Sequence, residues 1–129
     1  MAKQRNEIEE KYTWDLTTIF PTDEAFEAEL AQVSEEVKKA ASLAGHLLDS
    51  ADSLLTTTEV QLDLMRRIEK LYSYAHMKND QDTRVAKYQE YQAKGMTLYS
   101  DFGQSFAFYE PEFMAITEEQ YQAFLAEQP

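Results

Sequence analysis

Cysteine is absent from the 129-residue chain, and glycine and proline occur only three times each. Without cysteine, the chain can form neither a disulfide framework nor a thiolate metal site. The scarcity of glycine and proline leaves few positions that favour tight turns, which indicates long helices. No window of about 18 apolar residues is present, so we expect no membrane-spanning helix. The charged N-terminal stretch "MAKQRNEIEEK" lacks the apolar centre of a signal peptide, and a cytoplasmic protein is therefore expected.

Basic residues are also scarce, because 12 of them stand against 24 acidic residues, giving a formal net charge of −12. Phosphate recognition needs clustered Lys and Arg side chains, so this balance argues against a nucleic-acid partner. No basic residue follows Lys94, whereas several acidic residues do: Asp101, Glu110, Glu112, Glu118, Glu119 and Glu127. A solvated acidic face is the simpler interpretation of this segment, and attraction of a cation is the alternative.

The remaining composition, 43% hydrophobic and 28% charged residues, is that of an ordinary globular domain. We interpret residues 1–11 as a charged N-terminal extension and residues 12–129 as one helical domain. The domain begins with "YTWDLTTIFP", in which large apolar side chains alternate with polar ones before Pro21. We expect this lead-in to fold back as an apolar strap over the helices, burying four side chains: Trp14, Leu16, Ile19 and Phe20.

Apolar residues three and four positions apart predict the first long helix. Thr22 can cap this helix after Pro21, and Asp23 and Glu24 in the first turn complement the helix dipole. The helix is expected to end at Gly45. Its apolar stripe consists of Phe26, Leu30, Val33, Val37 and Ala40 or Ala41.

A second long helix is predicted after a connector that contains one helical turn near residues 51–54. Thr56 and Glu59 have capping-box spacing at the start of this helix, and the polar cluster "KNDQDT" ends it. A third helix, capped by Asp82 or Thr83, is expected to continue to Pro111.

Two further features complete the predicted fold. Gly95 within the third helix indicates close packing, because a glycine there costs about 1 kcal/mol in helix propensity. Thr117 and Gln120 form a capping-box pair that opens a short last helix. The expected fold is all-α: an antiparallel helical bundle of three long helices and one or two short ones, preceded by an extended aromatic lead-in.

Residues that could carry chemistry are few. The two histidines, His46 and His76, each lack a second histidine at helical spacing, so neither is expected to bind a metal. A calcium loop starting at Asp80 would have Val85 where glycine is required. Adjacent carboxylates, such as those at 35–36 and 118–119, do not converge on a helix, and no Gly-x-Ser-x-Gly turn is present. We therefore predict no catalytic, cofactor-binding or metal-binding residue in this chain.

The aromatic residues near the end of the third helix are the remaining candidates. Phe102, Phe106 and Tyr109 share one helical face, and we interpret them as part of the core. Phe108 points elsewhere on the same helix, and Phe113 follows Pro111. They are our candidates for contacts outside the bundle, with another domain or at a substrate cleft.

Four stretches, in this order, carry a resemblance to a known family: "YTWDLTTIFPTDEAFEAEL" at 12–30, "LAGHLLDSADSLL" at 43–55, "IEKLYSYAHMKNDQDT" at 68–83 and "FAFYEPEF" at 106–113. The chain resembles the start of oligoendopeptidase F over residues 12–126. Those enzymes are zinc metallopeptidases related to thimet oligopeptidase, and they cleave short peptides in the bacterial cytoplasm. Their zinc site, a His-Glu-x-x-His helix and a further glutamate, has no counterpart in this sequence.

The resemblance implies that the chain is the N-terminal helical domain of a longer peptidase. Its partners would be the remainder of the peptidase chain, which would hold the zinc, and an oligopeptide substrate. The lobe would flank the substrate cleft and be inactive alone, and a fragment could self-associate. The alternative is a free-standing helical adaptor. A reading frame that continues past Pro129 into a His-Glu-x-x-His helix would exclude that alternative.

Overall fold

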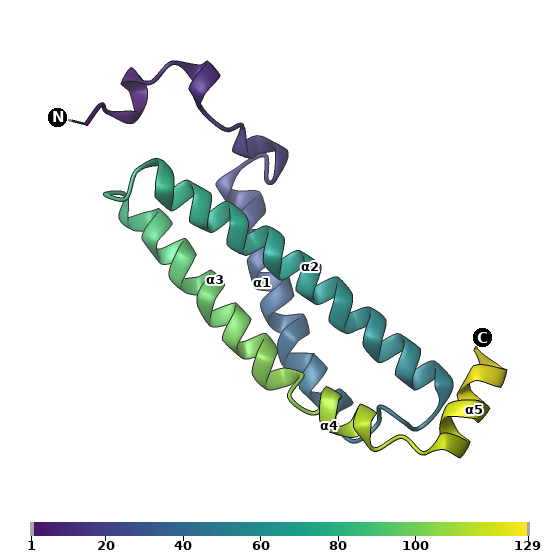
Figure 1. The fold of residues 1–129 in the computed structure, drawn as a ribbon. Helices are drawn as coiled ribbons and strands as arrows, with labels where there is room; N and C mark the ends of the chain where they lie inside the picture. Colours follow the sequence, from purple (N-terminus) through teal and green to yellow (C-terminus); the bar gives the residue numbers. More distant parts are fainter. Residues whose placement is uncertain (1, 129) are drawn as a thin grey trace.

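Three long helices dominate the computed structural model, which describes residues 2–128 (Figure 1). They are α1 (Asp23–Ala40), α2 (Ala51–Gln81) and α3 (Ala86–Ser105). Two shorter helices follow, α4 (Tyr109–Met114) and α5 (Glu118–Glu127). Single 3-10 turns stand at Arg5–Glu7, Glu10–Tyr12, Leu16–Thr18 and Ala41–Leu43. Successive long helices run in opposite directions, and the predicted all-α antiparallel bundle is confirmed.

The core lies where α1 packs across one face of the α2–α3 hairpin. The apolar stripe predicted for α1 is largely buried, and Leu30 lies at its margin. Thr22 caps the helix as expected, because its side chain accepts a hydrogen bond from the amide of Ala25 at 3.1 Å. The buried side chains of α2 and α3 that complete the core are Leu64, Ile68, Leu71, Tyr74, Ala75, Tyr91, Leu98 and Phe102.

Helices α2 and α3 approach closely at Gly95. A Cβ atom built on Gly95 would lie 3.4 Å from Cδ2 of Tyr72 and 3.7 Å from its Cα. The site therefore has room for little more than a methyl group, and the predicted close packing is confirmed.

Asp23 joins the N-terminus of α1 to both helices of the hairpin. Its carboxylate accepts hydrogen bonds from the hydroxyls of Tyr74, at 2.7 Å, and Tyr88, at 3.0 Å. Nζ of Lys87 lies 3.0 Å away. Partial burial opposes ionisation, but these three donors outweigh it and hold the pKa of Asp23 below its ordinary value.

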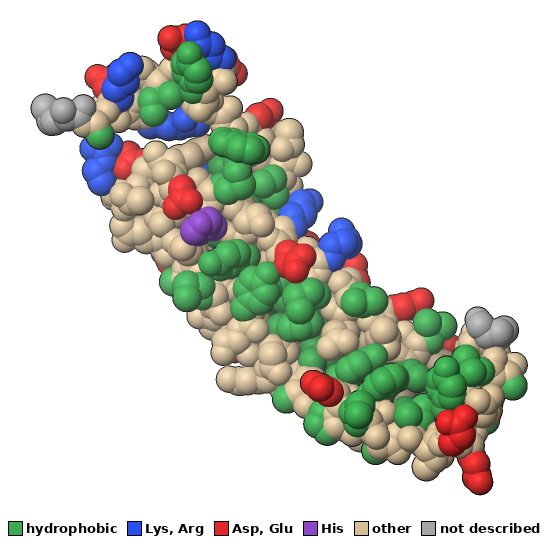
Figure 2. All heavy atoms as spheres, viewed as in Figure 1, with side chains coloured by type: hydrophobic (Ala, Val, Ile, Leu, Met, Phe, Trp, Pro, Cys, Tyr) green, Lys and Arg blue, Asp and Glu red, His purple; other side chains and the backbone are tan. Residues whose placement is uncertain are grey.

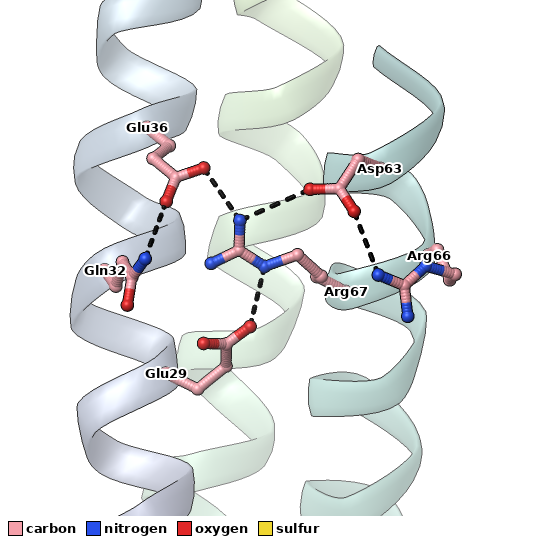
Figure 3. A network of polar contacts seen from close by, with 6 residues as sticks. All are labelled: Glu29, Gln32, Glu36, Asp63, Arg66 and Arg67. Carbon is pink, nitrogen blue, oxygen red and sulfur yellow. Dashed lines mark hydrogen bonds and ion pairs between the residues drawn. The ribbon is translucent and has the colours of Figure 1, made fainter. Parts of the chain in front are cut away.

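A second polar link joins α1 to α2 through Arg67 (Figure 3). The guanidinium donates from Nε to Glu29 and from Nη1 to Glu36, both at 2.7 Å. Asp63, one turn earlier on α2, lies 3.4 Å from the same Nη1. Only 14% of the Arg67 side chain is exposed, so this cation is largely withdrawn from water and surrounded by carboxylates.

Helix α2 is longer than the sequence pattern predicts. The helix begins at Ala51, because the hydroxyl of Ser50 caps it by accepting a hydrogen bond from the amide of Ser53 at 3.0 Å. The predicted cap at Thr56 is therefore wrong, and the connector is shorter than predicted, because the helical turn expected near residues 51–54 is the start of α2. Thr56 and Glu59 lie inside the helix, and Leu54 and Leu55 belong to its first turns.

The junctions of α3 also differ from the prediction. Val85, not Asp82 or Thr83, is the N-cap residue. Asp82 instead binds Arg84 through side-chain and backbone hydrogen bonds, which lower the pKa of Asp82 to about 2. The first α-helix likewise ends at Ala40, before a 3-10 turn leads to Gly45, which has φ +84°.

Pro111 does not end α3, which stops at Ser105. Pro111 occupies the first turn of α4, where the backbone N–H that proline lacks has no helical partner in any case. Tyr109, expected on the core face of a continuous α3, therefore starts a new helix and is only half-buried.

The lead-in is buried in part only. Leu16 and Phe20 are 5% and 7% exposed, and Ile19 packs at the margin of the core, but Trp14 is 77% exposed. The expectation that Trp14 is buried is therefore wrong. The side chain of Asp15 accepts a hydrogen bond from the amide of Thr17 at 3.0 Å and starts the turn that directs Leu16 inward.

Replacing Trp14 with alanine is therefore expected to change the melting temperature by less than about 2 °C, because exposed substitutions alter stability by about 0.5 kcal/mol or less. Thermal unfolding followed by circular dichroism measures this. Leu16→Ala is the matched variant from the same segment and should lower the melting temperature by more than about 5 °C. A large loss in W14A would contradict the exposed position of this side chain.

Candidate functional site

The end of the molecule formed by α4, α5 and the start of α2 carries the clearest candidate site (Figure 1). Helix α5 starts at a capping box, because Thr117 accepts from the amide of Gln120 at 3.2 Å and the Gln120 side chain accepts from the amide of Thr117 at 3.1 Å. This confirms the predicted cap. It sets the direction in which α5 turns back toward α2.

An apolar groove with a volume of about 350 Å³ lies between these elements. One hydrogen bond joins two of its lining residues, because the hydroxyls of Tyr109 and Thr58 are 2.7 Å apart. The Tyr109 ring also stacks on Phe113, with ring centroids 6.1 Å apart and planes 7° from parallel. The groove is lined by Ala51, Leu54, Leu55, Thr58, Tyr109, Phe113, Ile116, Tyr121, Phe124, Leu125 and Gln128. Figure 2 shows hydrophobic side chains gathered at this end of the molecule.

The structure separates the two aromatic candidates of the sequence analysis. Phe113 lines the groove and is 41% exposed. Phe108 packs at the margin of the core, where its ring stacks on Phe106 at 5.9 Å, and it does not line the groove. Phe102 and Phe106 are buried, as predicted. A role for Phe108 or Phe113 in contacts with another domain stays a prediction.

Sequence reasoning missed most of the groove. The sequence pattern predicts only an isolated helical turn near residues 51–54, whereas Leu54 and Leu55 both belong to the first turns of the long helix α2. Tyr121, Phe124 and Leu125 show an amphipathic spacing that marks one face of α5, but the spacing does not reveal which element that face meets. Recognising Ser50 as the helix cap would have placed the two leucines correctly.

Acidic side chains surround this end of the molecule. Between Lys94 and residue 128, no acidic side chain of the described chain takes part in an ion pair within 4.0 Å. Glu112 has a different partner, because its carboxylate accepts a hydrogen bond from the amide of Gly45 at 3.0 Å. No Lys, Arg or His side chain within residues 2–128 therefore pairs directly with a carboxylate of α4 or α5.

The two histidines lie in separate polar settings. Nδ1 of His46 is 2.8 Å from Asp49. On α2, Nε2 of His76 is 3.3 Å from Asp80, and its Nδ1 is 3.1 Å from the side-chain amide of Gln92. Within residues 2–128, no three His, Asp or Glu side chains are grouped so that they could hold a metal ion. No helix of the same residues is long and apolar enough to cross a membrane.

Comparison with known proteins finds relatives that are named oligopeptidase or oligoendopeptidase. The chain is 57% identical over 129 residues to the Group B oligopeptidase PepB of Streptococcus agalactiae serotype III (strain NEM316), covering 100% of the chain and 22% of that protein. It is 59% identical over 128 residues to the plasmid-encoded oligoendopeptidase F of Lactococcus lactis subsp. cremoris, covering 98% of the chain and 21% of that protein. No family model matches the sequence.

The fold is also found in a solved relative. The crystal structure of oligoendopeptidase-F from Enterococcus faecium matches with a TM-score of 0.73 and 32% identity, over 84% of this chain and 21% of that one. The chain thus spans about a fifth of the length of the relatives it matches. The resemblance drawn from the sequence is confirmed, and the chain is a homologue of the N-terminal fifth of oligoendopeptidase F-type peptidases.

Proposed function

We propose that the chain is the N-terminal helical lobe of a cytoplasmic, zinc-dependent oligoendopeptidase that hydrolyses internal bonds of short peptides. The observation that carries this proposal is homology over the whole chain to proteins named oligopeptidase or oligoendopeptidase. In the proposed arrangement the lobe flanks the substrate cleft and limits access to it, while the reacting groups belong to the other four fifths of the polypeptide.

The side chains present here do not fit a zinc centre. A catalytic zinc takes about three protein ligands that converge on one point. His46 and His76 are each paired with a single aspartate, and no such group of three exists in residues 2–128. Our proposal therefore assigns zinc binding to the remainder of the peptidase and gives this lobe a structural and gating role.

A chimera between this chain and the rest of a full-length relative tests this function. The chain would replace the corresponding first fifth of Streptococcus agalactiae PepB. We expect this chimera to cleave an internally quenched oligopeptide and to lose the activity on treatment with a chelator. The isolated 129-residue chain, supplied with zinc, should show no turnover. Turnover by the isolated chain, or an inactive chimera, would contradict the proposal.

A further inference from the structure

The groove between α2, α4 and α5 leaves several large apolar side chains partly exposed in a chain with a net charge of −12. Leu55, Phe113, Tyr121 and Leu125 all line it, and each is between 41% and 47% exposed. Helix α5 contributes no buried residue, so its apolar face is only partly covered by α2. Grouped apolar side chains of this kind mark a contact surface.

The groove is already shaped before anything binds in it. The Thr58 hydroxyl donates to the carbonyl of Leu54 at 2.7 Å and is also within 2.7 Å of the Tyr109 hydroxyl, which fixes α4 against α2. The hydrogen bond from the amide of Gly45 to Glu112 also holds α4 in place. A preformed groove needs little reordering when a partner docks, which favours a stable contact.

Charge restricts what can fill the groove. Glu118 and Glu119 start α5, Glu127 ends it, and Glu110 and Glu112 belong to α4, with no basic residue on either helix. In Figure 2, acidic side chains border the hydrophobic surface at this end. A second copy of the chain would bring two acidic rims together, which is unfavourable. A complementary partner presents apolar anchors flanked by Lys or Arg.

We propose that the occupant is an amphipathic segment, with basic flanks, from the remaining four fifths of the same peptidase polypeptide. This inference rests on the proposed function. The length of the relatives supports this inference, because they are about five times as long as this chain. The homology includes every residue that lines the groove. The groove is then the docking site through which the lobe binds the rest of the enzyme.

Thiol labelling tests directly whether the groove is a docking site, because the chain has no cysteine of its own. Leu125→Cys places a thiol in the groove. Glu35→Cys places one on the polar face of α1, where the side chain is 63% exposed. Maleimide labelling rates at both positions are compared by mass spectrometry between the isolated chain and the active PepB chimera. We expect the groove thiol to react about tenfold more slowly in the chimera and the α1 thiol to react at a similar rate in both.

The outcomes distinguish this inference from the proposed function. Equal labelling rates of the L125C thiol in the isolated chain and in an active chimera would refute the docking site. They would leave the peptidase proposal standing. Protection in the isolated chain that grows with its concentration would assign the groove to a second copy and also overturn the inference. Adding Glu118→Gln and Glu119→Gln should raise the labelling rate in the chimera. An unchanged rate would refute the proposal that the docked segment has basic flanks.

Discussion

Replacing Phe26 with alanine is expected to lower the free energy of unfolding by about 3–5 kcal/mol. Phe26 is fully buried and joins three other aromatic rings, whose centroids lie 5.7 Å away for Phe20, 5.2 Å for Tyr74 and 4.4 Å for Tyr91. These rings come from the lead-in, α2 and α3. Truncation therefore removes aromatic contacts from α1 to the lead-in, α2 and α3, and it leaves a cavity that the long helices cannot easily close.

Chemical denaturation at neutral pH, followed by circular dichroism, measures this loss. Phe113→Ala is the matched control, because it removes the same atoms from a side chain that is 41% exposed. The control should cost less than about 1 kcal/mol. Equal losses in the two variants would show that the aromatic cluster around Phe26 does not hold the bundle together.

The sequence predicts the long helices well because their apolar stripes repeat with the helical period. The stripe through Phe26, Val33 and Val37 is buried as its spacing requires, and the cap at Thr22 forms the expected hydrogen bond. Such features depend on residues that are close together in the chain. Local spacing therefore suffices to place them.

Features that depend on competition between neighbouring signals are less predictable. Ser50 and Thr56 both offer a helix cap, and the hydrogen bond that caps α2 forms at Ser50. Trp14 and Leu16 follow the same alternation, but the Asp15 turn sends only Leu16 inward. In each case the structure forms a local hydrogen bond that the apolar pattern does not reveal.

The groove could not be predicted for a further reason. Its walls come from α2 and α5, which are far apart in sequence, and a hydrogen bond joins two of its lining residues, Thr58 and Tyr109. The aromatic and acidic composition of residues 99–127 indicates only that the segment is unusual. Which face remains uncovered follows from the way α4 and α5 turn back after Ser105.

The second large effect is expected for Arg67→Met, which should lower the free energy of unfolding at pH 7 by about 2–3 kcal/mol. Methionine preserves most of the side-chain volume but leaves Glu29, Glu36 and Asp63 without their shared cation. Exposure of the carboxylates to solvent screens their repulsion and keeps the loss below that of a fully buried pair. Arg66→Met is the matched control, because the Arg66 side chain is 71% exposed and should contribute less than about 0.5 kcal/mol.

The pH dependence of the stability lost in R67M distinguishes an electrostatic cause from lost packing. The hydrogen bond from Arg67 holds the pKa of Glu36 below its ordinary value of 4.5. A carboxylate whose pKa is lowered on folding stabilises the fold above its unfolded pKa, and that contribution disappears as pH falls through the folded pKa. The difference in unfolding free energy between the parent chain and R67M should therefore be full at pH 7 and shrink below about pH 4.5. A difference that stays constant down to pH 3 would assign the role of Arg67 to packing, because the contribution of Glu36 declines once pH falls below its unfolded pKa.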